Sequence, residues 1–117
     1  MSGITSYAAG LSAEDCVARD YARRGLTVAA RRWRSPAGEI DLVARDGDTL
    51  VFVEVKQSRD FARAAARLTR RQMERITTSA LAFLAGEGRS LDTEMRFDLA
   101  MVDAAGRVER LENAFGA

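Results

Sequence analysis

The sequence of 117 residues predicts an α/β sandwich in which a central β-sheet is flanked by helices. Two segments have helix-capping signals and apolar residues at helical spacing, and several segments between and after them are rich in strand-forming residues. The length suits a single domain spanning residues 1–117, which can bury roughly two-thirds of its unfolded surface. A hydrophobic content of 47% is ordinary for a globular protein.

The first helix is expected to begin at Ser12, which can cap it, and to have acidic residues in its first turn. It should run to about Arg24, because Gly25 occupies a common helix-terminating position. Residues 26–33 then predict a strand, and the proline and glycine in residues 34–38 indicate a turn.

A β-hairpin is predicted next, with strands at residues 39–45 and 49–56 around Asp46-Gly47-Asp48. A capping box at residues 69–72 opens a second helix, which should end at Gly86. Residues 95–102 predict a further strand, and residues 107–111 a short edge strand. Together these elements predict a mixed sheet.

The hairpin should separate apolar from charged side chains, because side chains alternate across a strand. Burying Ile40, Leu42 and Ala44 with the valines of the second strand is compatible with a two-residue turn at Gly47-Asp48 or at Asp46-Gly47. The first turn would place Asp41 opposite Glu54. In either case four charged residues should share the other surface: Glu39, Asp41, Glu54 and Lys56.

Directly opposed carboxylates repel, and a bound divalent cation would relieve that repulsion. Mg²⁺ favours one or two carboxylates together with waters and phosphate oxygens. The alternative is a solvated polar face whose acids point apart or are neutralised by nearby arginines. The geometry of the hairpin leaves both interpretations open.

The composition excludes several kinds of chemistry. The chain has no histidine, so imidazole-dependent zinc sites and Ser-His or Cys-His nucleophiles are absent. A single cysteine, Cys16, cannot close an internal disulfide and is expected to be a small helix residue. Lys56 is the only lysine among 18 basic residues, and an ammonium offers a compact charge where arginine offers a planar fork.

The hairpin resembles the active-site hairpin of the PD-(D/E)XK nuclease superfamily, through Gly38-Glu39-Ile40-Asp41-Leu42 and Phe52-Val53-Glu54-Val55-Lys56. The closest resemblance is to the YraN-like family, a small branch related to archaeal Holliday-junction resolvases. Further residues that carry the resemblance are Gly10, Glu14, Gly25, Arg34 and Arg96-Phe97-Asp98.

The resemblance implies a restriction-endonuclease-like core and a metal-dependent endonuclease that hydrolyses DNA phosphodiesters, with branched or nicked structures preferred. It implies that Asp41, Glu54 and the main-chain carbonyl of Val55 ligate Mg²⁺ or Mn²⁺. Lys56 would orient the attacking water or stabilise the developing charge. Glu14 would add an acid from the first helix, or would be an ordinary first-turn acid favoured by the helix dipole.

Arginines are concentrated in two segments, residues 19–34 and residues 59–75, on either side of the hairpin in sequence. They could form the walls of a phosphate-binding groove or be solvated surface residues. Trp33 could stack on an unpaired base, or pack against the first helix. The arginines that we expect to contact nucleic acid are Arg31, Arg32, Arg34, Arg59, Arg63, Arg67, Arg70 and Arg71.

Two further functions remain open: a non-catalytic nucleic-acid-binding module that keeps the nuclease fold, and an interaction protein whose hairpin docks a basic partner. Asp98 is expected to pair with an arginine. Residues 1–10 lack the pattern of a secretory signal and no segment has the length of a membrane helix, so a cytoplasmic protein without a membrane partner is expected. A homodimer is expected only by analogy with the resolvases.

Overall fold

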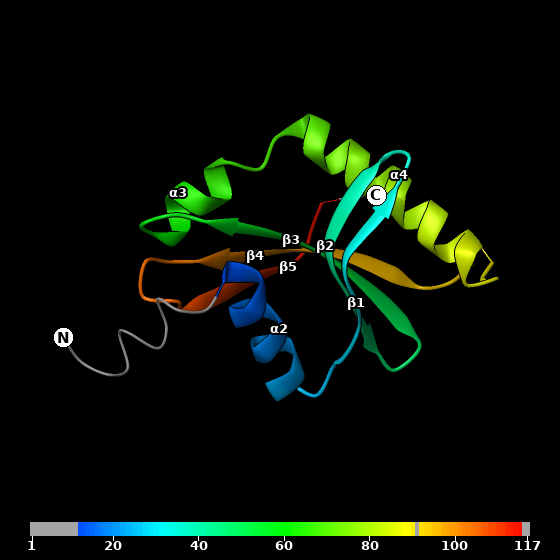
Figure 1. The fold of residues 1–117 in the computed structure, drawn as a ribbon, viewed down its shortest axis with the longest axis horizontal. Coiled ribbons are helices and arrows are strands. Elements are labelled where there is room, and N and C mark those ends of the chain that lie inside the picture. The colour runs from blue at the N-terminus through cyan, green and yellow to red at the C-terminus, as the bar shows by residue number, and fades with distance from the viewer. Residues whose placement is uncertain (1–11, 91, 116–117) are drawn as a thin grey trace.

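The structure, a computed structural model, describes residues 12–90 and 92–115. Within these residues a five-stranded sheet has the order β1-β2-β3-β4-β5, in which β3 and β4 are parallel and the other neighbours are antiparallel. The predicted α/β class and mixed sheet flanked by helices are confirmed, and the architecture is compatible with a restriction-endonuclease-like core. The elements, in chain order, are α2 (Ala13–Arg23), β1 (Thr27–Ser35), β2 (Gly38–Asp46), β3 (Thr49–Gln57), α3 (Phe61–Ala66), α4 (Arg70–Gly86), β4 (Met95–Val102) and β5 (Val108–Phe115) (Figure 1).

Both predicted helices begin at a capping box. The Ser12 hydroxyl accepts the Asp15 N–H at 3.0 Å, and the Asp15 carboxylate accepts the Ser12 N–H at 3.2 Å. Thr69 and Gln72 make the same reciprocal pair at the start of α4. Each box satisfies backbone N–H groups that have no partner within the helix. The predicted helix starts are therefore confirmed.

The helix α3 was not predicted from the sequence. Asp60 caps it by accepting the Arg63 N–H at 2.8 Å. The helix has six residues, which is too short for apolar periodicity to reveal it. Its Ala64 packs on Leu99 and Met101 of β4, so α3 covers the sheet where β3 and β4 end.

The sheet is buried on both faces (Figure 1). On one face α2 packs through Val17 and Tyr21 against the sheet. On the other face α4 packs through Ile76 and Phe83, and α3 continues that layer. The buried residues of the α4 side include Ile40, Val43, Leu50, Phe52 and Phe97, and those of the α2 side include Leu42, Ala44, Val51, Val53 and Ala100.

The hairpin of β2 and β3 has the register of a Gly47-Asp48 turn. Asp46 pairs with Thr49, and the ladder continues to the pair of Leu42 and Val53. The ladder between the two strands ends there, although β2 still pairs with β1 and β3 with β4. The hairpin therefore forks at this point: the start of β2 lies with β1 against α4, and the end of β3 continues toward α3 (Figure 1).

The prediction that Ile40 shares a face with Leu42 and Ala44 is wrong. Ile40 and its β1 partner Trp33 pack on the α4 side, whereas Leu42 packs on the α2 side. Simple alternation would put residues 40 and 42 on one face. The strands change face between these positions, and Arg32 of β1 has a positive φ of 50° there. Asp41 lies between the two β2 positions that face opposite sides of the sheet.

Candidate functional site

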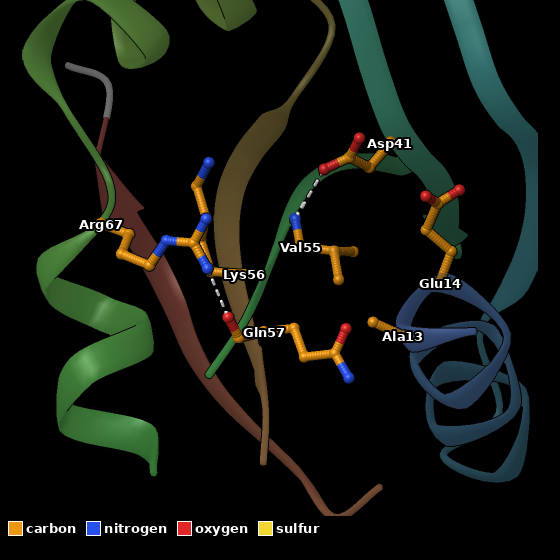
Figure 2. Close-up of a pocket in the computed structure, with 7 residues that line it drawn as sticks. All are labelled: Ala13, Glu14, Asp41, Val55, Lys56, Gln57 and Arg67. Atoms are coloured by element: carbon orange, nitrogen blue, oxygen red, sulfur yellow. Dashed lines mark hydrogen bonds between the residues drawn. The ribbon is translucent and has the colours of Figure 1, made fainter. Parts of the chain in front are cut away.

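Asp41 lies at the fork of the hairpin. Its Oδ2 accepts the backbone N–H of Val55 at 2.8 Å, two residues past Val53, the last residue of β3 that pairs with β2 (Figure 2). This bond satisfies an N–H of β3 that β2 no longer reaches through its backbone. The side chain of Asp41 is thereby fixed beside the segment that carries Glu54, Val55 and Lys56.

Glu54 is a buried carboxyl group, with 5% of the residue exposed. Burial, followed by the neighbouring Asp41 carboxyl, raises the pKa of Glu54 from 4.5 to about 8, whereas Lys56 opposes the shift. The Lys56 Nζ lies 3.5 Å from the Glu54 Oε2. Asp41 and Lys56 therefore both lie beside Glu54, but Glu54 is buried and, unlike Asp41 and Lys56, does not line the adjoining cavity.

An open cavity of about 320 Å³ adjoins the fork. Figure 2 shows Asp41 and Glu14 on one side of it and Arg67 on the other. The Arg67 Nη1 donates to the main-chain oxygen of Gln57 at 2.7 Å, which holds the guanidinium at the end of β3. The residues that line the cavity are Ala13, Glu14, Asp41, Val55, Lys56, Gln57 and Arg67.

Arg32 is the partner of two predicted site acids. Its Nε lies 3.1 Å from the Glu39 Oε1 and 3.6 Å from the Glu14 Oε2. The hydrogen bond that Arg32 donates to Glu39, followed by the charge of Glu14, raises the pKa of the Arg32 guanidinium. Glu14 reaches the cavity with Asp41, whereas Glu39 is not among the residues that line it.

The residues at the fork include the oxygen donor types that hard divalent cations take. Asp41 and Glu54 offer two carboxyl groups, and the Val55 carbonyl belongs to the same strand segment. Burial raises the pKa of Glu54, and the neighbouring Asp41 carboxyl adds to the rise. Across residues 12–90 and 92–115, no three acidic or thiol side chains gather tightly enough to hold a metal by themselves. Mg²⁺ typically needs only one or two carboxylates, with waters completing its shell.

The predicted nucleic-acid-binding arginines fall into two groups. Three of them form ion pairs on the surface: Arg31 with Asp15, Arg32 with Glu14 and Glu39, and Arg63 with Asp60. Arg67 lines the cavity. Four are exposed and form no hydrogen bond or ion pair with another residue in the described ranges: Arg34, Arg59, Arg70 and Arg71.

Sequence reasoning assigned no role to Gln57, which lines the cavity and whose carbonyl anchors Arg67. Its position directly after Lys56 was the available signal. Trp33 packs edge-on against Phe83 of α4, with ring centroids 5.2 Å apart, and not against the first helix. Gly10, which helped to carry the family resemblance, lies outside the described residues.

Asp98 is completely buried and pairs with an arginine, as predicted. Arg96 Nε lies 3.1 Å from its Oδ1, and the Tyr21 hydroxyl donates to its Oδ2 at 2.7 Å. The backbone N–H of Asn113 donates to Oδ1 at 2.9 Å. Asp98 therefore ties α2 and β5 to β4, and it does not line the cavity.

The fold and site define an α/β protein with a mixed five-stranded sheet and a carboxylate pair at the fork of a hairpin. Residues 13–102 match the profile of the "Uncharacterised protein family UPF0102", and the chain belongs to that family. The expected membership of the YraN-like group is confirmed at this level.

Relatives match over nearly the whole chain. A UPF0102 protein of Cereibacter sphaeroides is 61% identical over 117 residues, which is 100% of both chains. A UPF0102 protein of Ruegeria pomeroyi is 58% identical over 97% of this chain and 93% of its own. One from Dinoroseobacter shibae is 46% identical over 95% of this chain and 83% of its own.

None of the helices in the described parts of the chain has the length and apolar composition that crossing a bilayer requires.

Proposed function

We propose that this protein is a metal-dependent endonuclease that hydrolyses DNA phosphodiesters, with branched or nicked structures as preferred substrates. The observation that carries the proposal is the carboxyl pair of Asp41 and Glu54 at the fork, next to the only lysine of the chain. The resemblance of this hairpin to that of the PD-(D/E)XK superfamily supports the reaction class. The resemblance to resolvases supports the preference for branched DNA.

In this proposal Asp41, Glu54 and the Val55 carbonyl hold Mg²⁺ or Mn²⁺. When bound, the cation would neutralise phosphate charge and make a water nucleophilic at neutral pH. Lys56 orients that water or stabilises charge that develops on the phosphate. Its contact with Glu54 Oε2, at 3.5 Å, keeps the ammonium beside the carboxyl pair.

Glu14 faces the same cavity from α2 and can accept a proton or a hydrogen bond from a water molecule there. Glu39 acts indirectly: it positions Arg32, which also lies next to Glu14. Arg67 provides a positive charge on the opposite side of the cavity, where a phosphate oxygen would need one.

The test is a set of labelled linear, nicked, flapped and four-way DNA molecules incubated with Mn²⁺ or Mg²⁺. The wild type should cut the branched or nicked molecules, and Asp41→Asn should abolish cutting. The asparagine oxygen can still accept the Val55 N–H, so the fold should survive. DNA binding should be kept or strengthened, because a negative charge near the phosphate is lost. Equal cutting by Asp41→Asn and wild type would refute the site assignment.

A second candidate is a non-catalytic nucleic-acid-binding module. The ion pairs of Arg32 with Glu14 and Glu39, and of Lys56 with Glu54, favour it, because they balance acidic charge without any metal. This alternative predicts salt-dependent binding of the same DNA panel with no cleavage in either metal. The absence of binding even at low salt would leave a protein-interaction role for the hairpin face.

A further inference from the structure

Arg75 of α4 lies across Gly38, the residue that opens β2. A Cβ built at Gly38 would lie 2.6 Å from the Arg75 Cγ and 2.9 Å from its Nε, so a side chain at Gly38 would displace Arg75. Gly38 also has a φ of 149°, which side-chain-bearing residues rarely adopt. The aliphatic part of Arg75 therefore packs directly on the backbone of Gly38.

A second contact holds the same flank of α4 against the turn between β1 and β2. The Ser35 hydroxyl donates to the Ser79 hydroxyl at 3.0 Å, one helical turn beyond Arg75. The backbone of α4 is thus held beside the start of β2 at Arg75, whose side chain is exposed. Its guanidinium forms no hydrogen bond or ion pair with any residue in the described ranges.

Arg71 lies one turn earlier on α4, and residues four apart on a helix are neighbours on its surface. It too is exposed without an acidic partner among the described residues. Two like charges in this relation oppose each other, and no carboxylate compensates them. This differs from Arg31, Arg32 and Arg63, each of which pairs with an acid.

Gly38, on which Arg75 lies, is close to the candidate site along the chain. Asp41 follows Gly38 by three residues on β2, which is about 10 Å at the rise of a strand. That length corresponds to roughly three nucleotide steps of one B-DNA strand. A strand with a phosphate at the fork could therefore reach the guanidinium over Gly38 within a few nucleotides.

We propose that Arg71 and Arg75 bind the phosphate backbone of the nucleic-acid strand whose neighbouring phosphate lies at the fork, and that Gly38 exists to position Arg75. This inference rests on the proposed function. It assigns the protein surface along which the nucleic-acid strand would run. The surface contacts phosphates and not base edges, so it contributes affinity and orientation without sequence preference.

The test compares binding of labelled single-stranded and four-way DNA by fluorescence anisotropy, in chelator so that nothing is cut. At 0.1 M salt Arg75→Gln should bind four-way DNA about eightfold more weakly than the wild type does. This is the factor that the loss of one phosphate contact with duplex DNA implies. The slope of log affinity against log salt should fall by about 0.9 for duplex arms and 0.7 for the single strand. Arg71→Gln should behave in the same way.

Arg23→Gln is the matched control, because Arg23 is also an exposed helix arginine but lies on α2. It should bind as the wild type does. If Arg75→Gln and Arg23→Gln bind alike while the wild type binds and cuts DNA, this inference is wrong and the proposed function stands. If the wild type does not bind DNA at low salt, both are wrong.

The role of Gly38 has its own test. Gly38→Ala should lower the melting temperature and the salt slope, because the new methyl group displaces Arg75. In the double variant Gly38→Ala with Arg75→Ala the colliding atoms are gone, so part of the lost melting temperature should return. Strictly additive losses would show that contact with Arg75 is not what requires glycine there.

Discussion

The carboxylate of Asp41 takes the place of a strand partner for Val55, whose backbone N–H it binds at 2.8 Å where β2 and β3 separate. The bond joins the two halves of the candidate site through one side chain. It also directs the Asp41 carboxyl toward the buried Glu54, and this closeness contributes to the high pKa of Glu54. The separation of the strands and the pairing of the acids are therefore parts of one arrangement.

Glu54 should make the metal-free protein less stable as the pH rises. Its pKa is about 8 in the folded protein and 4.5 as the ordinary value, so between these values the folded state holds a proton that the unfolded chain releases. Stability is full below about pH 4.5, falls across that window and levels off above about pH 8. Thermal unfolding in chelator should show this fall in the wild type and a much weaker one in Glu54→Gln.

Divalent cations should oppose that loss. At pH 8, Mn²⁺ at ten times its dissociation constant should stabilise the wild type by about 1.4 kcal/mol, since it binds only the folded state. The measurement is the melting temperature against metal concentration, reversed by chelator. Asp41→Asn, which removes one ligand charge, should respond far less. An equal response from that variant would place the binding of Mn²⁺ elsewhere.

Lys56→Ala should slow DNA cleavage by roughly 100-fold or more, the usual effect of removing a group that stabilises charge in the transition state. Its effect on the Mn²⁺-induced melting shift should be smaller, because Lys56 is not a ligand. Lys56→Arg is the informative companion: it keeps the charge but replaces a compact ammonium by a planar fork. Unchanged cleavage by Lys56→Ala would remove this residue from the mechanism.

Tyr21→Phe should destabilise the fold without affecting the candidate site. The phenol donates to the fully buried Asp98 at 2.7 Å, and burial and Asp98 both raise the pKa of Tyr21, so it remains a donor. Loss of this donor should cost about 1–3 kcal/mol in urea unfolding. Arg23→Gln, an exposed substitution, should stay within about 0.5 kcal/mol of the wild type. Cleavage per folded molecule should not change.

Local signals allowed most of the fold to be predicted. The capping boxes at Ser12 and Thr69 and the turn at Gly47-Asp48 are each specified by residues within four positions of one another. Their outcome depends little on the rest of the chain. The helix α3 was missed because its capping residue, Asp60, precedes only six helical residues.

The sequence predicted which residues belong to the candidate site, but not the backbone path and the contacts that bring them together. Alternation placed Ile40 with Leu42, but the structure shows a change of face between them, and Arg32 on the neighbouring strand has a positive φ. A non-glycine residue in that region carries strain that only surrounding tertiary contacts can maintain. The pairing of Arg32 with Glu14 and Glu39 is likewise a contact between distant segments, which residue spacing does not reveal.

The hydrogen bond from the Asn113 backbone to Asp98 links β5, near the end of the chain, to the carboxylate that also holds α2. Asp98 also holds Tyr21 of α2, and α2 carries Glu14 to the cavity. Trimming the chain before Asn113 would strip a donor from a carboxylate that has no access to water. Loss of this bond should destabilise the fold, as Tyr21→Phe should, so affinity tags and truncations at the C-terminus should spare the whole of β5.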